Sequence, residues 1–118
     1  MSIERTDNPN WKVHPGEILK EEFLVPLKMS AYELAKRLDV PTPRINDIVL
    51  QKRGITPETA VLLARFFGTT EAFWLNLQAA YDIDRAKHRL ARKLKAITPR
   101  VAAASRLKKI LSGLDLLN

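Results

Sequence analysis

Apolar residues recur at intervals of three and four positions along most of the chain, and Ser, Thr, Pro and Gly separate the resulting runs. This interval is the period of an amphipathic helix with one face turned toward a core. The separating residues are the types that begin and end helices. The chain is therefore predicted to be all-α, with five helices up to about residue 84 and more helical sequence beyond it.

Two helices are predicted before residue 40. Pro15 suits the first turn of a helix, and Pro26 is expected to stop that helix because the residue before a proline avoids the α conformation. Ser30 and Glu33 then form a capping box, in which each side chain accepts a hydrogen bond from the other residue's backbone. An apolar stripe follows each start: Ile18, Leu19 and Phe23 in the first helix, and Ala31, Leu34, Ala35 and Leu38 in the second.

Three more helices are predicted from two Thr-Pro pairs and a glycine. Thr42-Pro43 and Thr56-Pro57 each combine a capping hydroxyl with a proline in the first turn. Gly68 ends the fourth helix in the left-handed conformation, and the fifth helix begins near Thr70. The predicted buried faces are Ile45, Ile48 and Val49 in the third helix and Val61, Leu62, Ala64, Phe66 and Phe67 in the fourth. The fifth helix carries Phe73, Trp74, Leu77 and Tyr81.

The composition fits one small domain and argues against several kinds of chemistry. With 118 residues, of which 46% are hydrophobic, the chain can bury one core. It has no Cys and two His, so neither a disulfide framework nor a metal site is expected. It carries no glycine-rich phosphate loop, and we expect no enzyme activity and no cofactor. The start does not resemble a signal peptide, and the apolar runs are short. A cytoplasmic protein without a membrane partner is expected.

The net charge of +7 is unevenly distributed. Residues 1–84 carry ten Lys and Arg against twelve Asp and Glu, whereas residues 85–118 carry ten against one, so the whole basic excess lies in the last third. A basic segment of this kind attracts polyanions. We therefore divide the chain into an irregular arm (1–13), a helix-turn-helix domain (14–84) and a basic amphipathic helical extension (85–118).

The segment from Ser30 to Gly54 has the pattern of a helix-turn-helix. It combines two short helices, a tight turn and the small residue Ala35 where the helices approach each other. The polar side chains of the second helix lie off its buried stripe, where they could enter the major groove and pair with base edges. The same spacing also suits a generic helical hairpin. The predicted DNA-binding residues are Ser30, Tyr32, Thr42, Arg44, Asn46, Gln51, Lys52 and Arg53.

The aromatic stripe of the fifth helix has two interpretations. Trp74, Leu77 and Tyr81 could belong to the core, or they could form a subunit interface, where large aromatic residues are enriched. A single helix-turn-helix rarely binds DNA tightly, whereas two copies on a two-fold axis read a palindrome. We therefore predict a homodimer with these three residues at its interface.

Several short motifs between residue 14 and about residue 84 give the chain a family resemblance. The motifs are His14–Glu17, Leu34-Ala35, Ile45, Ile48, Gly54–Thr56, Thr59-Ala60, Leu63-Ala64, Phe67-Gly68 and Phe73–Gln78. With them the chain closely resembles the HigA-type antitoxins, which belong to the phage-repressor and Cro-type helix-turn-helix superfamily. The resemblance implies a five-helix DNA-binding domain, a dimer formed through its C-terminal side and repression of its own operon. It also implies double-stranded operator DNA and a HigB-like toxin, an mRNA-cleaving ribonuclease encoded beside it, as partners.

Three features depart from the family pattern. Asp39 stands at the turn position that usually holds Gly, and Asp tolerates the left-handed conformation well enough for the turn to form. Gln51 replaces the Gly common after the recognition helix, so this helix is expected to run longer or to end differently. The basic extension is longer than the family pattern and inherits no role from it.

Two other functions remain open at this point. The acidic balance of residues 1–84, and Asp47 on the presumed reading face, favour a module that sequesters a toxin without reading DNA. A transcriptional regulator with no toxin is the second alternative. The basic extension also has two interpretations: its charge could contact DNA phosphates beside the operator, or its apolar residues could pack on the domain or on a toxin. Those apolar residues are Leu90, Leu94, Val101 and Leu107.

Overall fold

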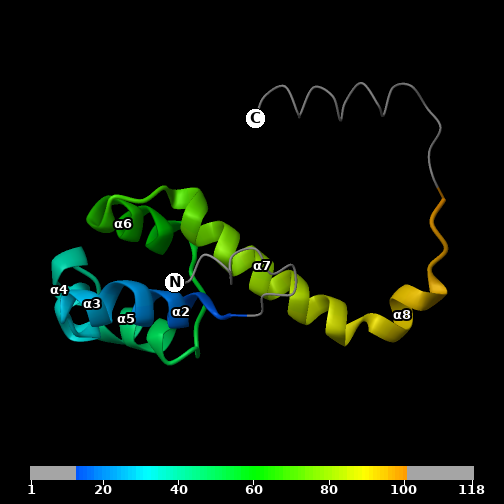
Figure 1. Ribbon diagram of the computed structural model, residues 1–118, viewed down its shortest axis with the longest axis horizontal. Helices are drawn as coiled ribbons and strands as arrows, with labels where there is room; N and C mark the ends of the chain where they lie inside the picture. Colours follow the sequence, from blue (N-terminus) through cyan, green and yellow to red (C-terminus); the bar gives the residue numbers. More distant parts are fainter. Residues whose placement is uncertain (1–12, 101–118) are drawn as a thin grey trace, which may run out of the picture.

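The computed structural model describes residues 13–100, and every regular element within that range is a helix. Three segments form one continuous first helix, and four separate helices follow it in the domain, which confirms the predicted all-α, five-helix helix-turn-helix architecture (Figure 1). An eighth element continues the chain beyond them. The elements are α2 (Pro15–Ile18), the π-helical segment η1 (Leu19–Leu24), α3 (Val25–Leu27), α4 (Ala31–Leu38), α5 (Thr42–Val49), α6 (Pro57–Phe67), α7 (Glu71–Arg89) and α8 (Ala91–Ala96).

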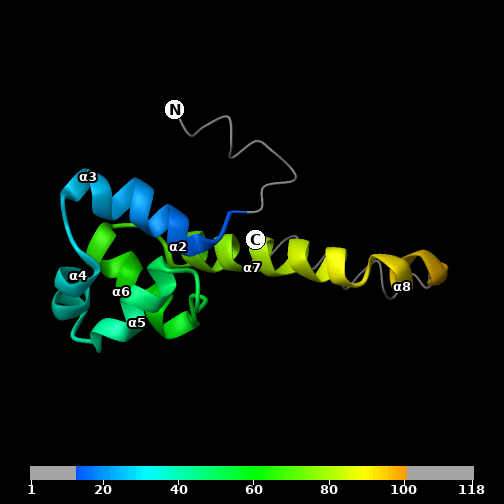
Figure 2. The ribbon, with the colours of Figure 1, turned by 90° about the horizontal axis from the view of Figure 1, so that it is seen from below.

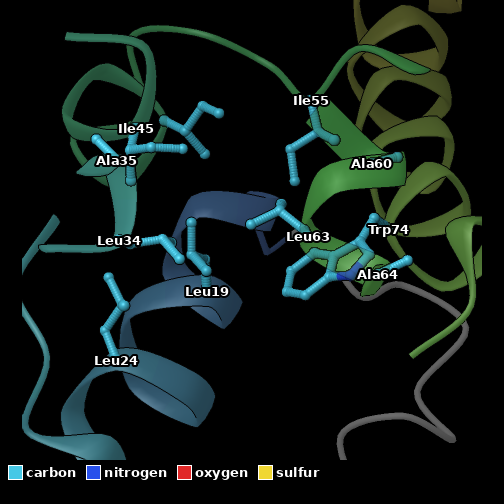
Figure 3. Close-up of a cluster of buried hydrophobic side chains, with 11 residues drawn as sticks. Leu19, Leu24, Leu34, Ala35, Ile45, Ile55, Ala60, Leu63, Ala64 and Trp74 are labelled. Atoms are coloured by element: carbon cyan, nitrogen blue, oxygen red, sulfur yellow. The ribbon is translucent and has the colours of Figure 1, made fainter. Parts of the chain in front are cut away.

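The core lies where the first helix, α4, α5, α6 and the first turns of α7 meet. Figure 3 shows Ala35 and Ile45 on one side of this cluster, Ile55 and Trp74 on the other, and Leu19 between them. Each Leu or Ile side chain that is fully removed from water contributes about 1.5–3 kcal/mol. The side chains with no exposed surface include Leu19, Leu34, Ile45, Ile48, Leu63 and Trp74.

The prediction that Pro26 stops the first helix is wrong. The helix continues through Pro26 and ends only at Lys28, which adopts the left-handed conformation with φ of 54°. A proline inside an α-helix removes one hydrogen bond and clashes with the carbonyl four residues earlier. Here the turn before it widens into the π-helix η1, and the Val25 N–H donates to the Lys20 carbonyl five residues back. The wider turn accommodates the proline ring.

Most of the other predicted helix ends are confirmed, and one more is wrong. Ser30 and Glu33 form the capping box, Thr56 and Thr70 cap α6 and α7 through their side chains, and Gly68 ends α6 with φ of 72°. Thr42 is wrong as a cap, because it is already the first residue of α5 and no side chain caps that helix. Pro41, which precedes it, is held in the extended conformation and takes the capping position instead.

Two expectations for the later helices also change. Val61 was expected on the buried face of α6, but it is exposed on the outside of that helix. Helix α7 continues past residue 84 to Arg89, and its C-terminal half projects from the domain together with α8 (Figure 2). The part of the predicted helical extension that follows residue 100 falls on residues outside those described.

The first helix approaches the end of α5 so closely that only glycine fits. A Cβ atom built on Gly16 would overlap the carbonyl oxygen of Ile48 and lie 2.8 Å from its carbonyl carbon. Both Ile48 atoms belong to the backbone, so neither can move aside by a change of side-chain rotamer. Gly16 therefore fixes the distance between α2 and the last turn of α5.

We predict that Gly16→Ala destabilises the fold by about 1–3 kcal/mol, the usual cost of overpacking a well-packed interior. The methyl group would force α2 away from α5. Lys20→Ala, an exposed change on the same continuous helix, is the matched control and should change stability by less than about 0.5 kcal/mol. Urea unfolding of both variants tests this. Equal stabilities would show that the close approach relaxes at no cost.

Candidate DNA-binding surface

Helices α4 and α5 are joined by a tight turn built on Asp39. This residue adopts the left-handed conformation with φ of 57°, and its N–H donates to the carbonyl of Lys36 over 3.2 Å. The N–H of Val40 donates to the carbonyl of Ala35 over 3.0 Å. Ala35 is fully buried, so its small side chain allows the two helices to approach. The prediction that Asp39 supports this turn in place of glycine is confirmed.

Helix α5 has one buried side and one polar side. Ile45 and Ile48 have no exposed surface and hold the inner face against the core. On the outer side Asn46 is exposed, and Thr42 and Arg44 are half-buried near the N-terminal end. A two-turn helix held in this way can enter the major groove, which is wide enough to admit one.

Arg44 lies beside the first turns of α6. Its side chain lines a surface depression of about 460 Å³ together with Glu58, Val61 and Leu62. It is the third residue of α5, and in helix-turn-helix proteins the N-terminal residues of the recognition helix contact base edges. The exposed Val61 thus borders the same depression as Arg44.

The start of α4 carries two of the predicted DNA-binding residues, Ser30 and Tyr32. The Ser30 hydroxyl oxygen accepts the Glu33 N–H over 3.0 Å, and Glu33 Oε1 accepts the Ser30 N–H over 3.0 Å. The Ser30 hydroxyl keeps its own hydrogen to donate outward. Tyr32 is exposed, and the Lys36 ammonium lies 5.4 Å from the centre of its ring. The phenol of Tyr32 and the ammonium of Lys36 therefore lie together on the turn that follows Ser30.

The loop after α5 carries the remaining predicted contacts. The helix does not run longer: it ends at Val49, and Gln51 adopts the left-handed conformation with φ of 64° that glycine would otherwise supply. Gln51, Lys52 and Arg53 are all exposed. Arg53 Nη2 lies 3.8 Å from Asp47 Oδ2, so this cation offsets the carboxylate on the reading face.

The structure brings the eight predicted residues to three places: the start of α4, the outer side of α5 and the loop that follows α5. In Figure 2 α4 and α5 lie on one side of the domain and α3 lies on the opposite side. The arrangement is that of a recognition helix flanked by groups that suit phosphate oxygens. The contact of each side chain with DNA stays a prediction.

The predicted interface stripe divides into a core residue and two surface residues. Trp74 is wrong as an interface residue, because its side chain is completely buried in its own domain, where its indole N–H donates to Thr69 Oγ1 over 2.8 Å. Leu77 and Tyr81 are half-buried. The Tyr81 ring borders a surface depression of about 630 Å³ on the projecting half of α7. For these two residues the interface stays a prediction.

The described part of the basic extension lies almost entirely on the surface. Leu90, Leu94 and Ile97 have 38%, 46% and 58% of their area accessible. They are interspersed with the cations of α8 and of the last turn of α7. The two interpretations of the extension stay predictions, and Val101 and Leu107 lie outside the described residues.

Charge is divided between the domain and the extension. Residues 1–84 carry two more acidic than basic side chains, so the overall charge of the domain does not attract DNA. Cations are instead placed locally, with Arg53 beside Asp47 and Lys36 over the Tyr32 ring. The strong positive charge is held in the extension, of which α8 is exposed along its whole length.

His14 ties the start of the first helix to α7. It is buried, its Nδ1 accepts the Gly16 N–H over 2.9 Å as the cap of α2, and its ring meets the Tyr81 ring edge-on at 4.8 Å. Burial lowers the pKa of His14 below its ordinary value of 6.5; nearby Asp82 raises this pKa and Arg85 lowers it. The neutral ring is the form that fits, because a protonated Nδ1 could not accept the hydrogen bond.

Gln78 is a residue to which sequence reasoning gave no role. Its side chain connects α7 to the loop that follows α5, by a hydrogen bond from the Ile55 N–H to Gln78 Oε1 of 2.7 Å. The available signal was a polar residue one turn after Trp74, within an otherwise apolar stripe.

Within residues 13–100 no three or more His, Cys, Asp and Glu side chains come together as metal ligands. In the same range no helix has the length and apolar character that a membrane crossing requires.

A family model, sequence relatives and solved structures all agree with a helix-turn-helix protein. A helix-turn-helix family model matches residues 19–74. Virulence-associated protein I of Dichelobacter nodosus is 51% identical, over 74% of this chain and 81% of that protein. Among solved structures, an addiction module antidote protein of the HigA family from Coxiella burnetii is 51% identical, with 75% of this chain and 98% of that chain covered and a TM-score of 0.72. The chain belongs to the HigA antitoxin family.

A second HigA structure bears on DNA binding. The antitoxin HigA of Pseudomonas aeruginosa, solved with the higBA promoter, is 40% identical; the match covers 76% of this chain and 99% of that chain with a TM-score of 0.74. The HigA-family assignment confirms the predicted helix-turn-helix DNA-binding class. It also confirms the prediction that the chain is a regulator and not an enzyme.

We predict that this HigA-family protein loses stability as the pH falls below about 6.5, because the unfolded chain then protonates His14 while the folded chain resists protonation. Stability is complete above the ordinary pKa and decreases until the pH passes the lowered pKa of the folded state. Thermal melts between about pH 7.5 and pH 5.5 measure the effect.

Two variants assign this dependence to one side chain. His14→Asn keeps a capping oxygen but removes the titrating ring, so its melting temperature should change much less over that pH range. His88→Gln removes the other, exposed histidine and should keep the wild-type dependence. A His14→Asn variant as pH-sensitive as the wild type would contradict the assignment.

Proposed function

We propose that this HigA-family protein binds operator DNA in its own promoter as a homodimer, represses its operon, and neutralises a HigB-like mRNA-cleaving toxin encoded beside it. The observation that carries the DNA-binding part is α5, an eight-residue helix with a fully buried inner face and a polar outer face. Held by Ile45 and Ile48, it keeps a fixed orientation toward the major groove. The relative solved with the higBA promoter supports the choice of promoter DNA as the ligand.

The reading face also has the chemistry that base recognition requires. Arg44 can pair with guanine and Asn46 with adenine, and both are on the outer side of α5. Lys52 and Arg53 follow the helix in an exposed loop, where cations suit phosphate oxygens. The ion pair of Arg53 with Asp47 reduces the repulsion that the Asp47 carboxylate would exert on DNA.

The toxin is proposed from the family relationship. The Coxiella burnetii relative is described as an addiction module antidote, which is a protein that counteracts a toxin. The described residues of this chain offer exposed apolar side chains outside the reading face, among them Val25 and Leu27. These surfaces leave room for a protein partner while α5 contacts DNA.

A dimer is supported by the form of α7. Its C-terminal half projects from the domain (Figure 2), where Ile83 is 54% exposed and Tyr81 is half-buried. A second copy related by a two-fold axis could cover this half and would place two recognition helices on one face of the DNA. The half-sites would then lie about 34–36 Å apart, one turn of the double helix.

Footprinting on the DNA upstream of the gene tests the proposed function. We expect two protected half-sites related by a two-fold axis and separated by about one helical turn. Expression of the neighbouring reading frame alone should arrest growth, and co-expression with this chain should relieve the arrest. Relief without a footprint would indicate a module that sequesters a toxin, and a footprint without a toxin would indicate a plain regulator. Either result would overturn part of the proposal.

We predict that Arg44→Ala costs about 1–3 kcal/mol of operator binding and relaxes preference at one base position, since it removes a contact to a base edge. Lys52→Ala should weaken binding to all sequences about equally, because a phosphate contact carries no sequence information. Competition binding on a set of single-base operator variants measures both effects. Identical sequence profiles for the two variants would contradict the proposed position of the recognition helix.

A further inference from the structure

The Gln78 side chain makes two hydrogen bonds, one to the chain that follows the recognition helix and one within α7 that orients the carboxamide. Its Oε1 accepts the Ile55 N–H over 2.7 Å, and its Nε2 donates to Asp82 Oδ1 over 3.0 Å. The two partners fix the orientation of the carboxamide, because an N–H can only donate and a carboxylate can only accept. We refer to this pair of bonds as the Gln78 bridge.

Gly54 is fitted to the same side chain. A Cβ atom at position 54 would lie 2.9 Å from the carboxamide carbon, oxygen and nitrogen of Gln78. Gly54 does not have a positive φ, so the obstacle to a side chain at position 54 is the Gln78 carboxamide and not the backbone conformation. A side chain at position 54 would therefore displace the Gln78 carboxamide without straining the loop.

The bridge acts on the loop that carries two of the proposed phosphate contacts. Lys52 and Arg53 directly precede Gly54, and both are exposed. Ile55, which directly follows it, is buried in the core cluster that also contains Trp74 of α7 (Figure 3). The Gln78 bridge therefore holds the loop at the point where it passes from solvent into the core.

The last turn of the recognition helix is connected to the same face of α7. Tyr81 lies one turn after Gln78, and residues three and four apart share a helix face. Its ring contacts His14, which caps the helix where the Gly16 backbone packs on the carbonyl of Ile48. One face of α7 thus supports the last turn of α5 through α2 and supports the following loop through Gln78.

We propose that Gln78 is a positioning residue for DNA recognition. Its hydrogen bond to the Ile55 N–H fixes the loop that presents Lys52 and Arg53. Because this loop directly follows the recognition helix, the bond also fixes where the chain leaves the end of that helix. This inference rests on the proposed binding to promoter DNA. Without the bridge the loop must be ordered when DNA binds, and that cost lowers affinity.

Binding to the promoter duplex upstream of the gene is the main measurement, made well below the melting temperature of each variant. Gln78→Ala should weaken binding about three- to tenfold, the ratio that corresponds to one hydrogen bond. Gly54→Ala should weaken it similarly by displacing the carboxamide. The double variant should be no weaker than Gln78→Ala alone, because both changes remove the same bridge. Asn76→Ala, on the exposed side of α7, is the matched control and should bind as the wild type does.

A rescue separates positioning from general stability. Gln78→Glu keeps the acceptor for the Ile55 N–H but places a carboxylate against Asp82, so it should weaken binding. Adding Asp82→Asn supplies an amide donor to the new carboxylate at position 78, restores both hydrogen bonds with the charge exchanged, and should recover wild-type affinity. Amide hydrogen exchange at Ile55 should accelerate in Gln78→Ala and return to the wild-type rate in the rescued variant.

The outcomes are distinct. Wild-type affinity in Gln78→Ala together with a lowered melting temperature would show a merely structural role and overturn the inference, as would additive losses in the double variant. If the wild-type chain bound no DNA upstream of its gene, the proposed function would fail. The exchange rate at Ile55 and the chemical shifts of Lys52 and Arg53 in Gln78→Ala would then still decide whether the bridge fixes this loop.

Discussion

An eight-residue helix makes only about two turns, and an isolated helix of that length is not stable in water. Helix α5 therefore depends on burying Ile45 and Ile48 completely against the core. That burial is possible because Ala35 and Gly16 let the neighbouring backbones approach. The same two isoleucines determine which side chains of α5 face outward. The stability of the recognition helix and its orientation toward DNA thus come from one packing interaction.

The helix ends around the reading unit use an unusual backbone solution. Lys28, Asp39 and Gln51 adopt the left-handed conformation at the ends of α3, α4 and α5, where glycine is the usual choice. Each such residue costs roughly 1–2 kcal/mol relative to an unstrained backbone. The buried side chains of α2 and η1 in the first helix, and those of α4 and α5, offset the cost. In return the turns carry side chains, and one of these, Gln51, is exposed beside the proposed phosphate contacts.

The sequence by itself determined the helices, most of their ends and the placement of the reading unit. These features depend on local rules: the spacing of apolar residues for the buried faces, Ser30 and Thr56 for the caps, and the left-handed tolerance of Asp39 for the turn. Local rules failed at two positions. At Pro26 the preceding π-helical turn lets the helix continue through the proline, and at Thr42 the extended Pro41 takes the capping position instead.

Only the tertiary structure decided which of several equivalent side chains are buried and what each one contacts. Trp74 and Tyr81 lie on the same predicted stripe, yet one is in the core and the other borders solvent, because the domain ends partway along α7. Gln78 gave no local signal of its hydrogen bond to Ile55, since the two residues are 23 positions apart. Contacts of this kind depend on where two helices meet in space, and helical periodicity describes one helix at a time.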